Sequence, residues 1–340
     1  MSHLVVESVG PATSVQDVGR QGAQRYGLTT SGAMDRLALA VANALLGQPM
    51  GTAAIEIGPL GAGFRARGGA VRVALAGAPR GMKVASRTAG MHQTVLVADG
   101  ETLTLGPAQG AVFSYLGLEG GIAGEPVYGS LSVNARAGLG SPYPRPLRAS
   151  DELTVGTADP GQAERRLDVA PHGPGPIRVV LGPQDDAMTA DAVAAFLAAE
   201  WLVSPKSDRM GYRLEGPELA HADGYNIVSD GTAPGSIQVP GNRQPLVLLA
   251  DRGTSGGYPK IATVITADLP RFAQIPAGRR MRFAAVPIEE AQAEARRFVA
   301  MLAGLPSRVE TLAKGAPPNE TLFAANLAGS AIDALDPQTW

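Results

Sequence analysis

The segment at residues 251–260 carries the densest set of side chains suited to chemistry. It follows an apolar run and combines an acid, cations, hydroxyls and paired glycines. Consecutive glycines let a ligand approach the backbone, whose N–H groups can stabilise an anion. The P-loop spacing Gly-x₄-Gly-Lys-Ser/Thr is absent. We predict catalytic roles for Asp251 and Lys260, and substrate-binding roles for Arg252, Thr254, Gly256, Gly257 and Tyr258. The alternative is a plain hairpin turn.

A second polar segment spans residues 13–35. Gln16, Asp17 and Arg20 place an amide, a carboxylate and a guanidinium on one glycine-containing turn, and Asp35 follows further along. Such a set can hold a small polar substrate or a carboxylate. We assign Asp17 to catalysis and Gln16, Arg20 and Asp35 to substrate binding. A helix-entry loop with its own Asp–Arg pair is equally compatible with the sequence.

A third segment, residues 206–216, contains Arg209 and Arg213. In an extended strand these two side chains share a face because their separation is even. They would then form a clamp for an anion, so both enter the predicted substrate site. The alternative is a charged strand edge that faces solvent.

Other candidates carry less weight. The four histidines are scattered without metal-ligand spacing, so we predict no metal site. The absence of cysteine excludes disulfides and thiolate chemistry. Lys83 follows a methionine as in a biotin-carrier site but lacks the second methionine, so we do not predict its biotinylation. Glu56 interrupts an apolar strand and is either exposed or functional.

The elements that hold these segments are short. Apolar runs with strand character recur every ten to twenty residues between glycines and prolines, which is typical of a barrel or sandwich. Helices are predicted over residues 35–46, residues 189–199, with Thr189 as N-cap, and residues 288–302. The strand-like runs lie at residues 4–9, 53–57, 71–75, 94–97, 102–105, 112–116, 177–181, 237–239, 245–250 and 262–266.

Length and composition set the outer limits. A chain of 340 residues with 45% hydrophobic residues predicts two halves, over residues 1–170 and 177–303, joined by a linker at residues 159–176. We assign residues 304–340 to a C-terminal tail and expect residues 306–340 to be poorly ordered. The net charge of −2 gives no case for nucleic acid or an anionic membrane. No export signal or membrane-spanning run is seen, so we expect a cytoplasmic location.

Several strings together resemble the carboxyltransferase domain family of the C/D type, also called allophanate hydrolase subunit 2, which includes the C component of bacterial 5-oxoprolinase. The resemblance covers about residues 4–290 and also implies a binding role for Gln238. It implies a mostly β fold of two cyclophilin-like β-barrel halves. The strings lie at residues 16–20, 31–35, 42–43, 56–57, 207–214, 235–240 and 251–260.

The resemblance implies a subunit of an ATP-hydrolysing amidohydrolase that opens the 5-oxoproline lactam to L-glutamate. It implies partners of the subunit 1 type (the B component) and of the lactam-utilisation type (the A component), with ATP and Mg²⁺ acting in the complex. Two alternatives stay open. One is a biotin-dependent carboxyltransferase acting on a urea-like amide, and the other is a non-catalytic regulatory partner of a subunit 1 type protein.

Overall fold

The computed structural model describes residues 1–170 and 172–312. Two antiparallel sheets form within the first 155 residues and enclose an apolar core that includes Leu4, Phe64 and Leu116. The first sheet has the order β11 (Glu152–Val155), β1 (Ser2–Val9), β4 (Ala62–Arg67), β9 (Thr102–Leu105), β6 (Met82–Val84) and β7 (Arg87–Ala89). The second has the order β2 (Ser14–Gln16), β3 (Ala54–Ile57), β10 (Ser114–Leu118), β5 (Val71–Gly77) and β8 (Thr94–Val97).

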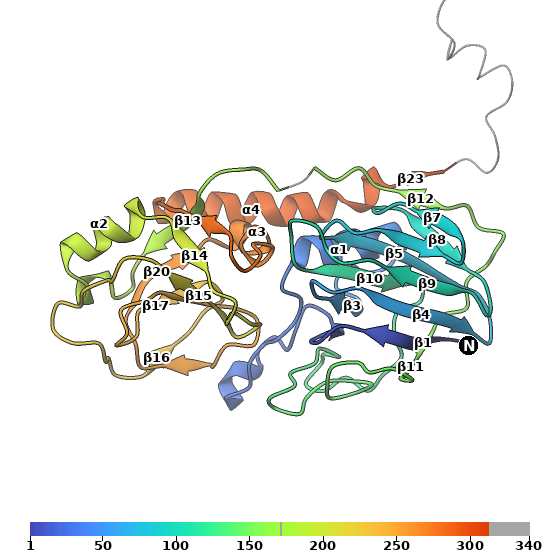
Figure 1. Cartoon of the computed structure of the whole chain (residues 1–340), viewed down its shortest axis with the longest axis horizontal. Helices are drawn as coiled ribbons and strands as arrows, with labels where there is room; N and C mark the ends of the chain where they lie inside the picture. The colour runs from blue at the N-terminus through green and yellow to red at the C-terminus, as the bar shows by residue number, and fades with distance from the viewer. Residues whose placement is uncertain (171, 313–340) are drawn as a thin grey trace, which may run out of the picture.

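One eight-stranded sheet follows in the second half and curls into a near-closed barrel (Figure 1). Its order is β21 (Arg280–Met281), β14 (Trp201–Val203), β15 (Gly211–Glu215), β18 (Leu246–Leu248), β17 (Ser236–Gln238), β20 (Lys260–Val264), β13 (Ile177–Leu181) and β22 (Phe283–Ala285). The pairing of β13 with β22 is parallel, whereas the other pairings in this sheet are antiparallel. The predicted mostly β class is confirmed.

The three predicted helices form, and Thr189 is the N-cap that the sequence predicts. Asp35 accepts a hydrogen bond from the Ala38 N–H and begins α1 (Arg36–Leu45). Thr189 does the same for α2 (Ala190–Ala198) through the Ala192 N–H. In the described part of the chain, no helix is long and apolar enough to cross a membrane. The remaining helical segments are α3 (Leu269–Ala273), α4 (Ile288–Gly304), η1 (Ala23–Tyr26), η2 (Asp185–Ala187), η3 (Thr266–Asp268) and η4 (Pro306–Arg308).

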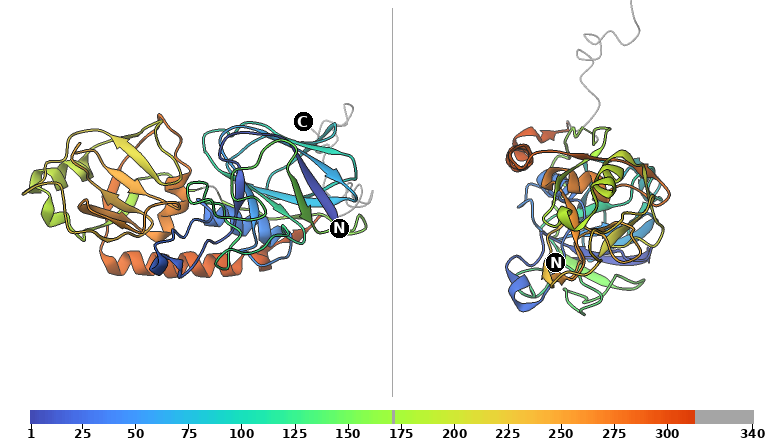
Figure 2. Two further views of the ribbon diagram at one scale, coloured as in Figure 1. Left: turned by 90° about the horizontal axis from the view of Figure 1, so that it is seen from below. Right: turned by 90° about the vertical axis from the view of Figure 1, so that its left-hand side faces the viewer.

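Helix α4 links the two halves. It runs alongside both of them in two perpendicular views (Figures 1 and 2). The chain then forms η4 and β23 (Glu310–Thr311), which pairs with β12 (Arg165–Arg166). Our expectation of a poorly ordered tail is therefore wrong for residues 306–312, because this segment completes a two-stranded sheet. Residues 313–340 lie outside the described residues.

The first part of the predicted linker packs on the first half instead of bridging freely. The Arg72 guanidinium, on β5, donates to Glu164 and to the main-chain oxygens of Asp159 and Gln162. Leu167 is buried in a core cluster that also includes residues of α1 and of the C-terminal barrel. The two halves therefore share apolar packing, and their relative position is fixed by side chains from both.

Candidate functional site

The segment at residues 251–260 sends its charged side chains in three directions. Asp251 pairs with Arg209, Arg252 lines a cleft between the halves, and Lys260 pairs with Asp230. Part of the segment also forms a ladder, since β19 (Ser255–Gly256) pairs with β16 (Asp230–Gly231). This pairing is with a distant strand, so it does not make the segment a hairpin turn, and the charged residues at the two ends of the segment contact different parts of the protein.

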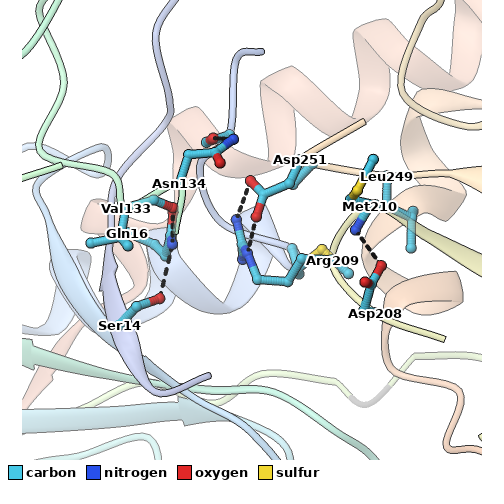
Figure 3. Close-up of polar contacts among 12 residues, drawn as sticks. Ser14, Gln16, Val133, Asn134, Asp208, Arg209, Met210, Leu249 and Asp251 are labelled. Atoms are coloured by element: carbon cyan, nitrogen blue, oxygen red, sulfur yellow. Dashed lines mark hydrogen bonds and ion pairs between the residues drawn. The ribbon is translucent and has the colours of Figure 1, made fainter. Parts of the chain in front are cut away.

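Arg209 is the centre of a buried ionic network between the halves, and Figure 3 shows its pairing with Asp251. Its side chain is 11% exposed and donates through Nε to Asp251 Oδ2 at 2.9 Å and through Nη2 to the Gly32 oxygen at 2.7 Å. Nη1 donates to Glu56 Oε1. Burial lowers the pKa of Arg209, but the attraction of Glu56 and Asp251 outweighs it, so the pKa lies above its ordinary value. Its hydrogen-bonding capacity is used within the protein.

The network continues from Glu56 into the first half. Glu56 Oε2 accepts from the Met34 N–H at 3.0 Å and from the Tyr115 hydroxyl at 2.6 Å. Tyr115 Oη in turn accepts from the Asp35 N–H at 2.8 Å, and Asp35 Oδ2 accepts from Gln274 Nε2 at 2.8 Å. Glu56 is fully buried. Of the two interpretations left open for it, exposure is wrong, and its contacts make it a structural acceptor at the joint.

Tyr115 is held as a neutral phenol by this environment. Burial, and then the neighbouring carboxylates of Glu56 and Asp35, raise the pKa of Tyr115 well above its ordinary value. The hydroxyl thus donates to Glu56 and accepts from the backbone at the start of α1. It fixes the distance between β3 and the N-terminus of that helix.

Arg213 does not join Arg209 in an anion clamp. Arg209 lies in the turn before β15 and points to the joint, whereas Arg213 lies within β15 with its side chain exposed. The even spacing therefore does not place the two guanidinium groups on one face, because only one of them belongs to the strand. The charged-edge interpretation describes Arg213.

Asp17 is surrounded by protein donors. Its Oδ1 accepts from the Gly19 N–H and the Ser130 hydroxyl, both at 2.7 Å, and from the Ser132 hydroxyl. Its Oδ2 accepts from the Leu131 N–H at 2.7 Å. These bonds anchor residues 130–132 to the turn after β2, so the carboxylate is a structural acceptor in this state. Its predicted catalytic role stays a prediction.

Gln16 and Arg20 are buried on either side of Asp17. Gln16 Nε2 donates to Ser14 Oγ at 2.9 Å and to the Val133 oxygen at 3.0 Å, as Figure 3 shows. Arg20 is fully buried and donates to the Ser132 oxygen through Nη2. Its Nε and Nη1 have no partner among the described residues, and burial lowers its pKa despite the attraction of Asp17 and Asp251. The predicted Asp–Arg pair makes no direct hydrogen bond.

A cleft of about 680 Å³ lies between the two halves and the face of α4. Arg252 and Arg36 line it, together with Thr30 and Ser31 from the loop before α1. Arg252 was predicted as a binding residue, but Arg36 was not, because a basic residue directly after a helix cap has an ordinary role on a solvated helix face. The cleft contains no side chain of Asp251, Lys260 or Arg209.

Lys260 occupies a second polar cluster on the barrel. Its side chain is 3% exposed, and Nζ contacts Asp230 Oδ2 at 2.8 Å, while Asp230 is 52% exposed. Gln184 joins them, accepting from the Lys260 N–H and donating to Asp230. The hydrogen bond from Lys260 lowers the pKa of Asp230. Asp230 and Gln184 were not predicted, since isolated polar residues in loops carry no periodic signal.

Gln238 faces the same cluster from β17. Its register partner is Lys260, and its buried Nε2 has no partner among the residues described here. A Cβ added at Gly256 would lie 2.3 Å from this nitrogen, so any larger residue there would displace the Gln238 amide. Nearby, Tyr258 is 38% exposed, and the main-chain oxygens of Thr254 and Gly257 accept from Thr232 and Ile227.

The structure offers no cluster suited to Mg²⁺ within its described ranges. No group of three or more His, Cys, Asp or Glu side chains converges there. Asp17, Asp35 and Asp251, the three acids predicted near the site, each accept hydrogen bonds from protein groups. The carboxylates of residues 1–170 and 172–312 therefore do not form a metal site by themselves.

Comparison with known protein families shows the family of this chain. Residues 26–285 match the family described as carboxyltransferase domain, subdomain A and B. The chain belongs to this carboxyltransferase family. The sequence motifs resemble the C/D type, whereas the matching family is described by subdomains A and B. The predicted family is therefore confirmed as that of the carboxyltransferase domain.

Two relatives are similar over nearly their whole length. The chain is 36% identical over 290 residues to the C component of 5-oxoprolinase from Escherichia coli (strain K12), covering 85% of this chain and 93% of the relative. It is 34% identical over 282 residues to the same component of the Haemophilus influenzae enzyme, covering 82% and 89%. This chain is thus similar to 5-oxoprolinase C components over 93% and 89% of their length.

Larger proteins contain a similar region. A putative urea carboxylase of Emericella nidulans is 30% identical over 320 residues, which cover 88% of this chain but 26% of that protein. The crystal structure of K. lactis urea amidolyase matches 93% of this chain with a TM-score of 0.82 at 23% identity, and the chain spans 21% of it. The latter likeness establishes the fold.

Proposed function

We propose that this chain is the C component of an ATP-dependent 5-oxoprolinase complex that hydrolyses the 5-oxoproline lactam to L-glutamate. The observation that carries the proposal is the 36% identity to a 5-oxoprolinase C component over 93% of its length. A relative that is matched over 93% of its length is a better guide to function than an enzyme that is matched over 26% of its length.

The chemistry of the reaction sets requirements that the cleft can meet in part. A lactam carbon is a poor electrophile, so the γ-phosphoryl group of ATP is transferred to the lactam oxygen. A first water adds to the carbon and the C–N bond breaks, which gives the acyl phosphate of glutamate. A second water then hydrolyses this acyl phosphate to L-glutamate and phosphate. The substrate carboxylate and the phosphate both need cationic or N–H partners. Arg252 and Arg36 supply cations in the cleft, and Lys260 supplies one on the barrel.

The remaining requirements point to partner proteins. The sequence has no P-loop, and the acids near the predicted site are engaged by protein groups. We propose that ATP and Mg²⁺ are bound with the participation of a subunit 1 type protein (the B component) and a lactam-utilisation type protein (the A component). We place the complex in the cytoplasm.

A second candidate is a biotin-dependent carboxyltransferase acting on a urea-like amide. The 30% identity to a putative urea carboxylase supports it. Such a reaction needs a biotin carboxylase and a biotin carrier, and this chain corresponds to 26% of that relative. In this alternative the same cations would stabilise the oxyanion of the biotin ureido group.

The experiment is reconstitution with the products of neighbouring genes. The chain is co-expressed with a candidate subunit 1 type protein and a candidate lactam-utilisation type protein, and 5-oxoproline-dependent ADP release is measured beside the same assay with urea. We expect ADP release with 5-oxoproline only. Release driven by urea, or a biotinylated protein required for turnover, would favour the carboxyltransferase alternative.

A further inference from the structure

Arg252 is a buried cation whose N–H donors form few hydrogen bonds, and those are long. The residue is 2% exposed. Its Nη1 lies 3.4 Å from both Thr30 Oγ1 and the Leu249 oxygen, which is long for a charged donor, and its Nε has no partner in the described structure. Burial, and then the positive charge of Arg36, lower the pKa of Arg252 to about 10. A guanidinium in this state lacks the anion that its burial calls for.

The surroundings of Arg252 supply no carboxylate. The side chains that line the cleft include two arginines but no aspartate or glutamate. Arg36 is exposed at the cleft and forms no ion pair within the part of the chain that is described. Arg20 is a second buried arginine in a neighbouring segment, whose main-chain N–H donates to the Thr30 oxygen at 2.7 Å. Asp251, the nearest acid in sequence, is occupied by Arg209.

The rest of the cleft is suited to a compact, partly apolar ligand. Helix α4 presents residues at positions 288, 291, 292, 295 and 298, which lie on one helical face, and the opposite wall comes from the barrel. Gln292 is the polar residue on that face, and Thr263 and Thr266 lie on the barrel side. The cleft therefore combines a cationic end, apolar walls and a few neutral hydrogen-bonding groups.

We propose that this cleft binds a small carboxylate ligand, with Arg252 as the principal carboxylate-binding residue and Arg36 as its second cation. A planar guanidinium with an unused Nε can bind a carboxylate through two parallel hydrogen bonds. Its identification as 5-oxoproline, a compact ring with one carboxylate, rests on the proposed function. The site itself rests on the buried, incompletely partnered arginine and on the absence of acids among the residues that line the described cleft.

Binding to the full chain tests the proposal by calorimetry with three probes. They are 5-oxoproline, 2-pyrrolidinone, which is the same lactam without the carboxylate, and inorganic phosphate. We expect 5-oxoproline to bind and 2-pyrrolidinone to bind at least about tenfold more weakly. Arg252→Gln should weaken 5-oxoproline binding by about tenfold or more, which corresponds to about 1.4 kcal/mol. Arg252→Lys should retain part of it, because the charge is kept and the planar fork is lost.

The matched control is Arg213→Gln, which removes an exposed arginine outside the cleft and should leave binding unchanged. Thermal unfolding of each variant verifies folding. Equal binding of 5-oxoproline by the wild type and Arg252→Gln would overturn the proposal, as would equal binding of the two lactams. Phosphate binding that depends on Arg252 and exceeds that of 5-oxoproline would overturn the carboxylate assignment.

Turnover by the reconstituted complex separates this inference from the proposed function. If the complex hydrolyses 5-oxoproline and Arg252→Gln leaves KM unchanged, the cleft inference is wrong and the function stands. If 5-oxoproline binding depends on Arg252 but no combination of components hydrolyses it, the carboxylate site stands and the proposed function is wrong. A rise in KM of about tenfold in Arg252→Gln supports both.

Discussion

Glu56 and Arg209 are 153 residues apart and form an ion pair that joins the two halves of the chain. Glu56 lies on β3 in the first half, and Arg209 precedes β15 in the barrel. The same guanidinium binds Asp251, and the same carboxylate binds Tyr115. Arg209, which we predicted to bind substrate, thus holds the two halves at a fixed spacing.

Removal of Arg209 should destabilise the protein strongly. Arg209→Met leaves the fully buried Glu56 carboxylate without its cation, and breaking a buried pair in this way costs about 3–5 kcal/mol. Denaturant unfolding measures the change in free energy. Arg213→Met, which removes an exposed arginine from β15, is the control and should change it by less than about 0.5 kcal/mol. Equal effects of the two substitutions would contradict the joint role.

Tyr115 should make stability depend on alkaline pH. Its pKa is raised in the folded state, so its contribution is complete below the unfolded value of about 10 and is lost as the pH rises above it. Above about pH 10, the free energy of unfolding of the wild type relative to Tyr115→Phe should fall by about 1.4 kcal/mol per pH unit. A difference that stays constant from about pH 9 to about pH 11 would show that the phenol ionises freely.

Asp17 should prove to be a structural residue. Asp17→Asn replaces a carboxylate that binds four protein donors, and we expect a loss of about 2 kcal/mol in the free energy of unfolding. Urea denaturation of the isolated chain measures it. Unchanged stability together with lost turnover of the complex would instead support the catalytic role predicted from the sequence.

Lys260 should affect turnover more than stability. Lys260→Met removes the buried charge and leaves Asp230, which is half-exposed and can be solvated. We expect a small change in the denaturation midpoint and loss of turnover by the complex. Asp230→Asn is the matched variant, and it should lower the midpoint more, because it leaves the ammonium group buried without its carboxylate. A normal rate for Lys260→Met would assign Lys260 to the structural residues.

The local parts of the fold could be predicted from the sequence. Asp35 and Thr189 mark the starts of α1 and α2 because a side-chain cap depends only on residues three positions away. The short strands follow from their apolar runs and flanking glycines. Their assembly into two sheets and a barrel is set by long-range pairing, such as β1 with β11, which no local pattern encodes.

The site could be predicted less completely from the sequence for the same reason. Arg209, Arg252 and Lys260 have the residue types of a binding site, but whether a cation is free depends on partners that are distant in sequence. Glu56 satisfies Arg209 from the other half, whereas no acid lines the described cleft beside Arg252. Arg36 and Asp230 complete the two polar clusters and carry no motif that distinguishes them from ordinary surface charges.

The most direct test of the proposed function is the product balance of the reconstituted complex. L-glutamate and ADP are measured together for the subunit 1 type and lactam-utilisation type partners with and without this chain, at saturating 5-oxoproline and ATP. We predict equal amounts of glutamate and ADP in the presence of the chain, and neither product when the chain is omitted or supplied alone. Full glutamate formation without the chain would contradict its role in a 5-oxoprolinase.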